Sequence, residues 1–193
     1  MLNLKKEISD YSLLIKNSLS TPLINLINEE IYTNAKNWGK GAVGDVGEKN
    51  QVRSVKVASF DEQDIGASIS KRIIFNDLKR FVSQLEDAYR EKVSKFYFSE
   101  KNYFQFLYYD DEMQGHYIYH VDNSCVNPRN LTILIGLNSK DEYEGGELFV
   151  ANQEQGVKLD KGDVVCFPSN FMFPHKVERV KKGKRKVLVI WTQ

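Results

Sequence analysis

Cysteine is scarce in this chain, with only Cys125 and Cys166 among 193 residues. Domains that depend on disulfides carry many more, so the composition excludes such a scaffold and favours a reducing compartment. Two thiols are also too few for a structural zinc site made of cysteines. A chain of this length can bury a core that is large enough to fold without cross-links.

Long apolar runs and an excess of charge of one sign are also missing. No segment approaches the roughly 20 apolar residues of a membrane-spanning helix. The N-terminal segment lacks the pattern of a signal peptide. The 27 lysines and arginines nearly balance 26 aspartates and glutamates, which gives no reason to expect a nucleic-acid or membrane partner. We therefore expect a cytoplasmic protein.

The first half of the chain has mostly helical periodicity. It predicts helices over residues 21–38 and 73–94, with strands over residues 11–16 and 52–60. The glycine-rich residues 39–50 have no apolar period and are expected to form a mobile loop. Such a loop could close over a substrate as a lid.

The second half changes to short β-rich runs separated by turn signals. Strands are predicted over residues 103–109, 117–120, 131–137, 147–151, 164–167, 172–180 and 187–192. This order predicts a mainly β (α+β) fold, with a sandwich or jelly roll backed by N-terminal helices. We expect a single domain over residues 1–193, in which residues 1–100 support a jelly-roll catalytic core over residues 101–193.

Three potential metal ligands lie on or just after two of the predicted strands. His120 and Asp122 are two residues apart, so on a strand both would point to one face. His175 lies in another apolar β-run. Two imidazoles and one carboxylate form the facial triad that leaves positions open on iron(II). A His-x-Asp pair alone is weak evidence, because a histidine often precedes an aspartate without binding metal.

Arg185 follows His175 by ten residues, in the run that leads into the last predicted strand. Its planar guanidinium could bind the far carboxylate of a dicarboxylate cosubstrate through two hydrogen bonds. The alternative is one more solvated charge in a lysine-rich run. Alternation argues against this alternative, because Arg185, Val187, Val189 and Trp191 share one face of the strand.

Several ordered motifs together resemble the 2-oxoglutarate/iron(II) dioxygenases of the prolyl 4-hydroxylase type, and within them the PKHD-type hydroxylases. The motifs are YIYHVDNS around His120, YEGGEL around Gly145 and the run from His175 to Arg185. The match is tight over residues 103–193, and the segment QVRS at residues 51–54 resembles the family more loosely.

The resemblance implies a double-stranded β-helix and a defined set of cofactors. Fe(II) would be held by His120, Asp122 and His175, with 2-oxoglutarate and O2 as cosubstrates and ascorbate as a candidate reductant. The expected reaction is hydroxylation of an unactivated C–H bond in a proline-containing peptide or protein, with no membrane or nucleic-acid partner. The oligomeric state stays open.

The resemblance is incomplete at one position near the cosubstrate. A tyrosine that some prolyl hydroxylases use for the far carboxylate would fall near Gly136. Tyr117, Tyr109 or Thr132 could supply a hydroxyl instead.

The remaining polar residues near the motifs carry weaker expectations. His116 is expected on the solvent side of a loop. For Arg53 and Arg129, surface ion pairs are favoured over substrate contacts. Asn123 could orient the metal aspartate or serve a turn.

Other functions fit the same residues. The same chemistry could act on a free amino acid, a lysyl side chain or a nucleobase. A cupin-like jelly roll could bind a metal or ligand without catalysis, and a zinc hydrolase could use the same three ligands. Succinate release separates the enzyme from the cupin-like module, and dependence on oxygen separates it from the hydrolase.

Overall fold

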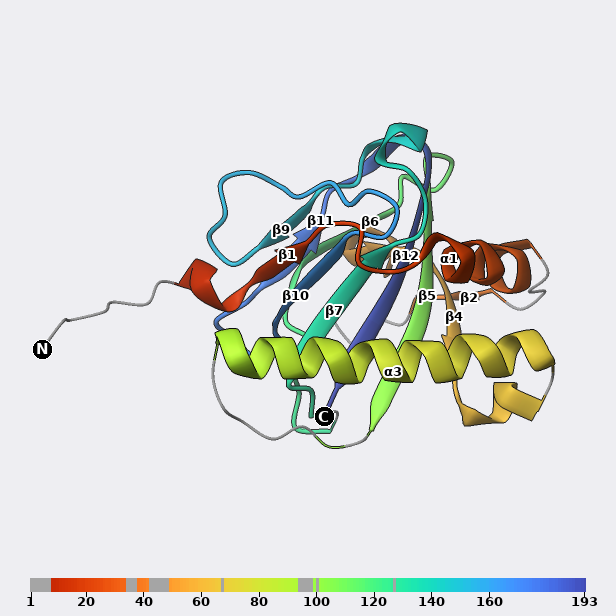
Figure 1. Cartoon of the computed structure of the whole chain (residues 1–193). Helices are drawn as coiled ribbons and strands as arrows, with labels where there is room; N and C mark the ends of the chain where they lie inside the picture. Colours follow the sequence, from red (N-terminus) through yellow and green to blue (C-terminus); the bar gives the residue numbers. More distant parts are fainter. Residues whose placement is uncertain are drawn as a thin grey trace, which may run out of the picture.

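The strands form two antiparallel sheets, with helices against one of them (Figure 1). The computed structural model describes residues 8–33, 38–41, 49–66, 68–93, 99, 101–126 and 128–193. The larger sheet has the order β1 (Leu13–Ile15), β10 (Val164–Pro168), β7 (Leu131–Gly136), β12 (Val180–Thr192), β5 (Asn102–Asp110), β4 (Lys56–Phe60) and β2 (Gly39–Lys40), with β8 (Tyr143–Gly145) paired to β12. The smaller sheet has the order β3 (Arg53–Ser54), β6 (His116–His120), β11 (His175–Val177) and β9 (Leu148–Val150).

The helices lie mainly in the first half of the chain. They are α1 (Thr21–Ile27), which continues into the π-helix η2 (Asn28–Thr33), then α2 (Lys49–Val52) and α3 (Ile69–Lys92), with 3-10 turns η1 (Ile8–Tyr11), η3 (Glu62–Gly66) and η4 (Lys140–Glu142). Among the described residues, no helix is long and apolar enough to cross a membrane.

Two apolar cores result from the alternation of side chains along the strands. One core joins α1 and α3 to one face of the larger sheet, through residues such as Leu78, Phe106 and Leu188. The other core fills the space between the sheets and contains Val187, Val189 and Trp191. Successive residues of β12 therefore alternate between the two cores, which places the Arg185 face of this strand between the sheets.

The mainly β arrangement with helices in the first half is confirmed, but several predicted boundaries are wrong. The predicted strand 52–60 is two strands in different sheets, because β3 pairs with β6 whereas β4 pairs with β5. Gly39–Lys40 forms β2 instead of a loop, and residues 42–48 lie outside the described residues, so the lid is not tested.

Helix α3 begins at Ile69, four residues earlier than predicted. The Ser68 hydroxyl accepts a hydrogen bond from the Lys71 backbone N–H at 3.0 Å and caps the first turn. An N-cap of this kind satisfies a backbone donor that the helix itself leaves unpaired. The apolar period alone gave no sign of the first turn, because Ile69 is 70% exposed.

Glu86 is a carboxylate on the buried face of α3, only 9% exposed. Burial raises its pKa to about 7, while Arg90 opposes and Asp87 adds to the shift. The folded-state pKa is above the unfolded value, so this group costs stability progressively as the pH rises through about 7. We expect Glu86→Gln to raise the free energy of unfolding at pH 8 by about 2 kcal/mol and to change little near pH 4.

Urea unfolding at the two pH values measures this difference. The exposed Glu91 on the same helix gives the matched control, Glu91→Gln. An equal effect of Glu86→Gln at both pH values would show that ionisation of Glu86 is not the cause.

Candidate metal centre and cosubstrate pocket

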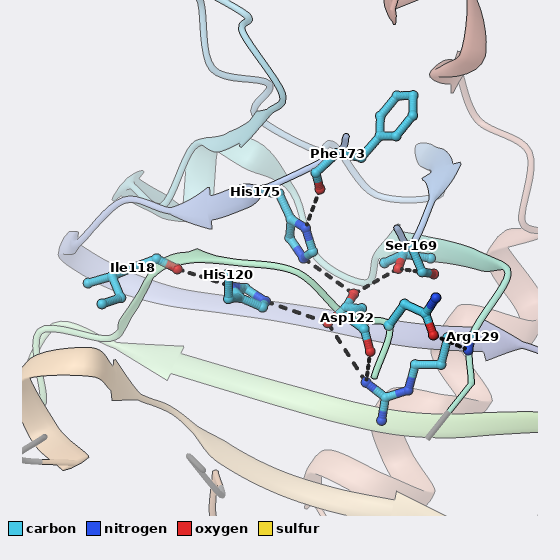
Figure 2. Close-up of polar contacts among 9 residues, drawn as sticks. Ile118, His120, Asp122, Arg129, Ser169, Phe173 and His175 are labelled. Carbon is cyan, nitrogen blue, oxygen red and sulfur yellow. Dashed lines mark hydrogen bonds and ion pairs between the residues drawn. The ribbon is translucent and has the colours of Figure 1, made fainter. Parts of the chain in front are cut away.

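His120, Asp122 and His175 come together between the sheets (Figure 2). His120 ends β6 and His175 begins β11, and the two residues are direct cross-strand partners. The His175 Nε2 lies 3.3 Å from one carboxylate oxygen of Asp122, and the His120 Nε2 lies 3.6 Å from the other. All three potential ligand atoms lie within 4.8 Å of one another. The three predicted ligands therefore converge on one point.

Backbone carbonyls orient both imidazoles. The Nδ1 of His120 lies 2.9 Å from the Ile118 oxygen, and that of His175 lies 3.2 Å from the Phe173 oxygen (Figure 2). With Nδ1–H as donor to the carbonyl, each Nε2 faces Asp122 and can present a lone pair to a cation bound between them; an Nε2 that carries a proton instead donates to the carboxylate. The donor set thus fits a divalent metal such as iron(II).

Asp122 is held by groups outside the triad. The Thr132 hydroxyl donates to its carboxylate at 2.7 Å and lies 2.8 Å from the Ser169 hydroxyl. The Arg129 guanidinium donates to the Asp122 backbone oxygen at 3.2 Å. Burial alone would raise the pKa of Asp122, but hydrogen bonds from His120 and His175 hold it well below its usual value. Asp122 is therefore a fixed, ionised group suited to bind a cation.

Thr132→Val should weaken metal binding without removing a ligand. The substitution keeps the shape of the side chain but removes the donor that orients Asp122. We expect a loss of about 10- to 100-fold in Fe(II) affinity, as for other groups that position metal ligands. Anaerobic competition with a coloured chelator measures it, and Thr132→Ser is the control that restores the hydroxyl. Unchanged affinity in Thr132→Val would mean that Asp122 needs no such support.

Arg185 is buried, at 1% exposure, next to Tyr109, which lines the same cavity as the triad. It is the cross-strand partner of Tyr109, and its guanidinium carbon lies 5.1 Å from the centre of the Tyr109 ring. None of its three guanidinium nitrogens has a hydrogen-bond partner within the described part of the chain. A buried charge without partners is costly, so this guanidinium fits an anion that binds there.

Two tyrosines are the polar neighbours of Arg185. Burial raises the pKa of Tyr109 and of Tyr143, and the Arg185 charge opposes the rise in both. Gly146 of the YEGGEL motif has a φ of 70°, and a Cβ there would lie 2.9 Å from the Arg185 side chain. The motif thus covers Arg185 closely because glycine has no side chain.

Gly136 explains the missing family tyrosine. A Cβ at this position would lie 2.3 Å from the Asp160 backbone oxygen. The segment at Leu159 and Asp160 therefore occupies the space that a tyrosine would need. Tyr109 lies beside Arg185, whereas Tyr143 donates from its hydroxyl to the Leu159 oxygen at 2.9 Å.

The three hydroxyl candidates from the sequence have different positions. Tyr109 lies beside Arg185 and also lines the central cavity. Tyr117 instead stacks on the His120 ring, with ring centres 3.5 Å apart. Thr132 gives its hydroxyl to Asp122. Of the three, Tyr109 has the geometry of a partner for Arg185.

A cavity of about 710 Å³ adjoins the triad. Tyr117 and Trp191 line it with flat faces, and Leu134 and Val189 add apolar surface. Arg129 lies 3.8 Å from the centre of the Trp191 ring, and Arg53 lies 4.6 Å from that of Tyr117. The cavity therefore joins the three potential ligands to aromatic walls that are large enough to hold a ring.

Other sequence expectations turned out differently. His116 is buried, with its ring nitrogens 2.8 Å from the Gln114 oxygen and 3.1 Å from the Gln51 oxygen, so its predicted solvent position is wrong. Arg129 is part of the centre instead of a surface ion pair. Asn123 accepts from the Arg129 backbone N–H at 3.1 Å, so it closes the loop.

Ser169 and Tyr143 were not predicted as parts of the site. The only available signal for Tyr143 was its place before the GGEL turn.

Curated relatives match less than half of the chain. A PKHD-type hydroxylase of Prochlorococcus marinus (strain MIT 9515) is 38% identical over 82 residues, covering 40% of this chain and 36% of the relative. One of Crocosphaera subtropica is 36% identical over 94 residues, covering 45% and 40%. The matched region thus spans well under half the length of these curated relatives.

Solved structures match nearly the whole fold. A Pseudomonas putida prolyl-4-hydroxylase superposes with a TM-score of 0.73 at 18% identity, covering 95% of this chain and 92% of that one. A Trichoplax adhaerens prolyl hydroxylase, solved with a hypoxia inducible factor peptide fragment, gives 0.73 at 20% identity, covering 95% and 84%. At these identities the likeness is one of fold.

One protein-family model also matches the chain. The model described as the 2OG-Fe(II) oxygenase superfamily matches residues 104–193. That family implies Fe(II), 2-oxoglutarate and O2 as cofactor and cosubstrates, in agreement with the donor set described above. Residues 104–193, which carry His120, Asp122, His175 and Arg185, therefore match the 2OG-Fe(II) oxygenase superfamily model, and the chain is similar to PKHD-type hydroxylases.

Proposed function

We propose that this chain is an Fe(II)- and 2-oxoglutarate-dependent dioxygenase that hydroxylates an unactivated C–H bond of a peptidyl proline. The observation that carries the proposal is the buried Arg185 guanidinium, without hydrogen-bond partners among the described residues, next to Tyr109, which lines the same cavity as the convergent His–Asp–His centre. A metal-binding module without a dicarboxylate cosubstrate would gain nothing from that buried charge. We also propose that the two sheets around this centre form a double-stranded β-helix. The whole chain is then a single oxygenase domain.

Each residue has a defined role in the proposal. His120, Asp122 and His175 hold Fe(II), and Arg185 with Tyr109 binds the far carboxylate of 2-oxoglutarate. The iron centre with 2-oxoglutarate and O2 supplies the oxidation that inserts one oxygen atom into a C–H bond, with succinate and CO2 as co-products. Leu134, Val189 and Trp191 limit the access of water to the cavity.

The aromatic walls support a ring-shaped reacting residue. Tyr117 and Trp191 both line the cavity beside the triad, so a pyrrolidine ring could lie against them. Relatives named as prolyl hydroxylases agree with this choice, and the Trichoplax protein was solved with a peptide. A cytoplasmic location fits the two free cysteines, and ascorbate would serve only as a reductant.

Reconstitution with Fe(II) and 2-oxoglutarate, followed by exposure to O2, tests the proposed function. We expect succinate release that rises with proline-containing peptides, and a product heavier by about 16 dalton, one oxygen atom. Absence of succinate under all these conditions, despite bound metal, would favour a non-catalytic module. Turnover that continues without oxygen would instead favour a hydrolase.

A further inference from the structure

A second cavity, of about 530 Å³, adjoins the one at the triad. Four residues line both cavities, so the two form one continuous depression: Ser59, Gln105, Arg129 and Trp191. The second cavity extends from Trp191 around the end of the larger sheet to Phe75 and Lys79 of α3. Figure 1 shows the elements on that side, where β4 leads into the turn before α3.

The second cavity differs in chemistry from the first. Its walls are rich in aromatic rings, from Phe60, Phe75, Tyr103 and Phe104. Tyr103 is 49% exposed and Phe75 lies beneath the Lys79 amine, 5.7 Å from its ring centre. An apolar or aromatic side chain could cover these rings and remove them from water.

A hydrogen-bond donor without a partner lies where the cavities meet. Trp191 is 6% exposed, and its indole N–H has no acceptor among the residues that the structure describes. Buried indole N–H groups usually find a partner. A backbone carbonyl of a chain passing from one cavity to the other would supply it.

The charges of the second cavity favour a polypeptide over a nucleic acid. Lys79 and Lys101 line it together with Asp61 and Glu62, so both signs are present. A nucleic-acid backbone requires a surface of mainly positive charge. An extended peptide has no such requirement, and it offers both apolar side chains and carbonyl groups.

We propose that the second cavity binds an apolar or aromatic side chain of a polypeptide substrate, from a residue near the one that reaches the triad. This inference rests on the proposed function and deepens it, because it makes the substrate an extended chain instead of a free amino acid. Arg129 and Trp191 then contact the substrate between its two anchored residues. The substrate class is a peptide with a bulky apolar residue beside the reacting residue.

A peptide series tests the preference directly. The series consists of peptides of about ten residues with one central proline, in which each flanking position in turn is tryptophan or alanine. N-acetylprolinamide serves as a minimal substrate without flanking residues. We expect tryptophan at one of the flanking positions to lower KM about tenfold, which is the effect of burying one aromatic side chain. Anaerobic binding of the same peptides, with Fe(II) and 2-oxoglutarate present, should give the same order of affinity.

Tyr103→Ala locates the effect in the second cavity. We expect it to remove the tryptophan preference, but to leave the KM of the minimal substrate and the uncoupled succinate release unchanged. Tyr119→Ala is a matched control, because Tyr119 is 51% exposed and lies outside the residues lining either cavity. Lys79→Ala, at the far wall, should weaken the preference as well.

The outcomes separate this inference from the proposed function. Uncoupled succinate release without any flanking preference would overturn the second binding site and leave the oxygenase intact. A preference that survives Tyr103→Ala and Lys79→Ala would also overturn it. Stronger competition by a single-stranded oligonucleotide than by the peptides would do the same. Absence of succinate in every arm would contradict the proposed function, while ordered peptide binding would still support the site.

Discussion

Asp122→Ala is expected to abolish both peptide hydroxylation and uncoupled succinate release. Asp122 is the single carboxylate of the centre, 3.3 Å and 3.6 Å from the two Nε2 atoms. Its removal leaves two neutral imidazoles to hold a divalent cation, which loses several kcal/mol of electrostatic stabilisation. That corresponds to a loss on the order of 10³-fold in rate. Succinate release and metal content after dialysis measure the two effects together.

The control for Asp122→Ala is the same substitution at an exposed aspartate. Asp141 in η4 is exposed and distant in sequence from the three candidate ligands, so Asp141→Ala should retain full activity. The thermal stability of both variants shows whether the fold persists. Retention of stoichiometric iron and turnover in Asp122→Ala would mean that the metal binds elsewhere.

Arg185→Met is expected to change cosubstrate binding and stability in opposite directions. The guanidinium is 1% exposed and lacks hydrogen-bond partners among the described residues, so it destabilises the protein without cosubstrate. Methionine keeps much of the side-chain length but removes the charge. We therefore expect the free energy of unfolding of the variant to be about 2 kcal/mol higher than that of the unmodified protein when no cosubstrate is present.

Binding of 2-oxoglutarate to the same variant should weaken on the order of 100-fold, because a buried charge-assisted contact is lost. Arg185→Lys tests the geometry, since an ammonium cannot form the two parallel bonds of a guanidinium. We expect it to recover only part of the affinity. Unchanged affinity in Arg185→Met would place the carboxylate anchor at another residue.

At the metal centre, the spacing of His120 and Asp122 correctly predicted that both residues meet His175. Strand alternation explains this meeting only in part. Strand β6 ends at His120, so Asp122 lies beyond it and strand alternation does not place its side chain. Thr132, ten residues later, fixes the carboxylate instead. Such a contact depends on how a loop returns to the sheet, which residue spacing does not contain.

Arg185 shows where alternation was sufficient. Lys184 is exposed and Arg185 is buried within one strand, as the period of two predicted. The run of lysines around Arg185 did not obscure this pattern. The strand is continuous through Gly183, which has a φ of 77°. Arg185 pairs with Tyr109 of β5, and β7 pairs with β12 from Val187 onward.

The contacts between distant aromatic and charged groups could not be predicted. The stacking of Arg129 on Trp191 joins a loop to the last strand, and no local pattern links them. The division of the predicted strand 52–60 at Val55 has a similar origin. The sequence allows both parts of the predicted strand to pair with other strands. Only the three-dimensional arrangement decides which sheet each part joins.

Calorimetric titration of 2-oxoglutarate under anaerobic conditions, into iron-loaded and metal-free protein, tests the joint action of the centre and Arg185. If one cosubstrate molecule contacts both, its affinity must depend on the metal, and the two binding free energies must be coupled. We expect one molecule per chain, bound at least about tenfold more tightly when Fe(II) is present. Equal affinity with and without iron would contradict the assignment of one shared site.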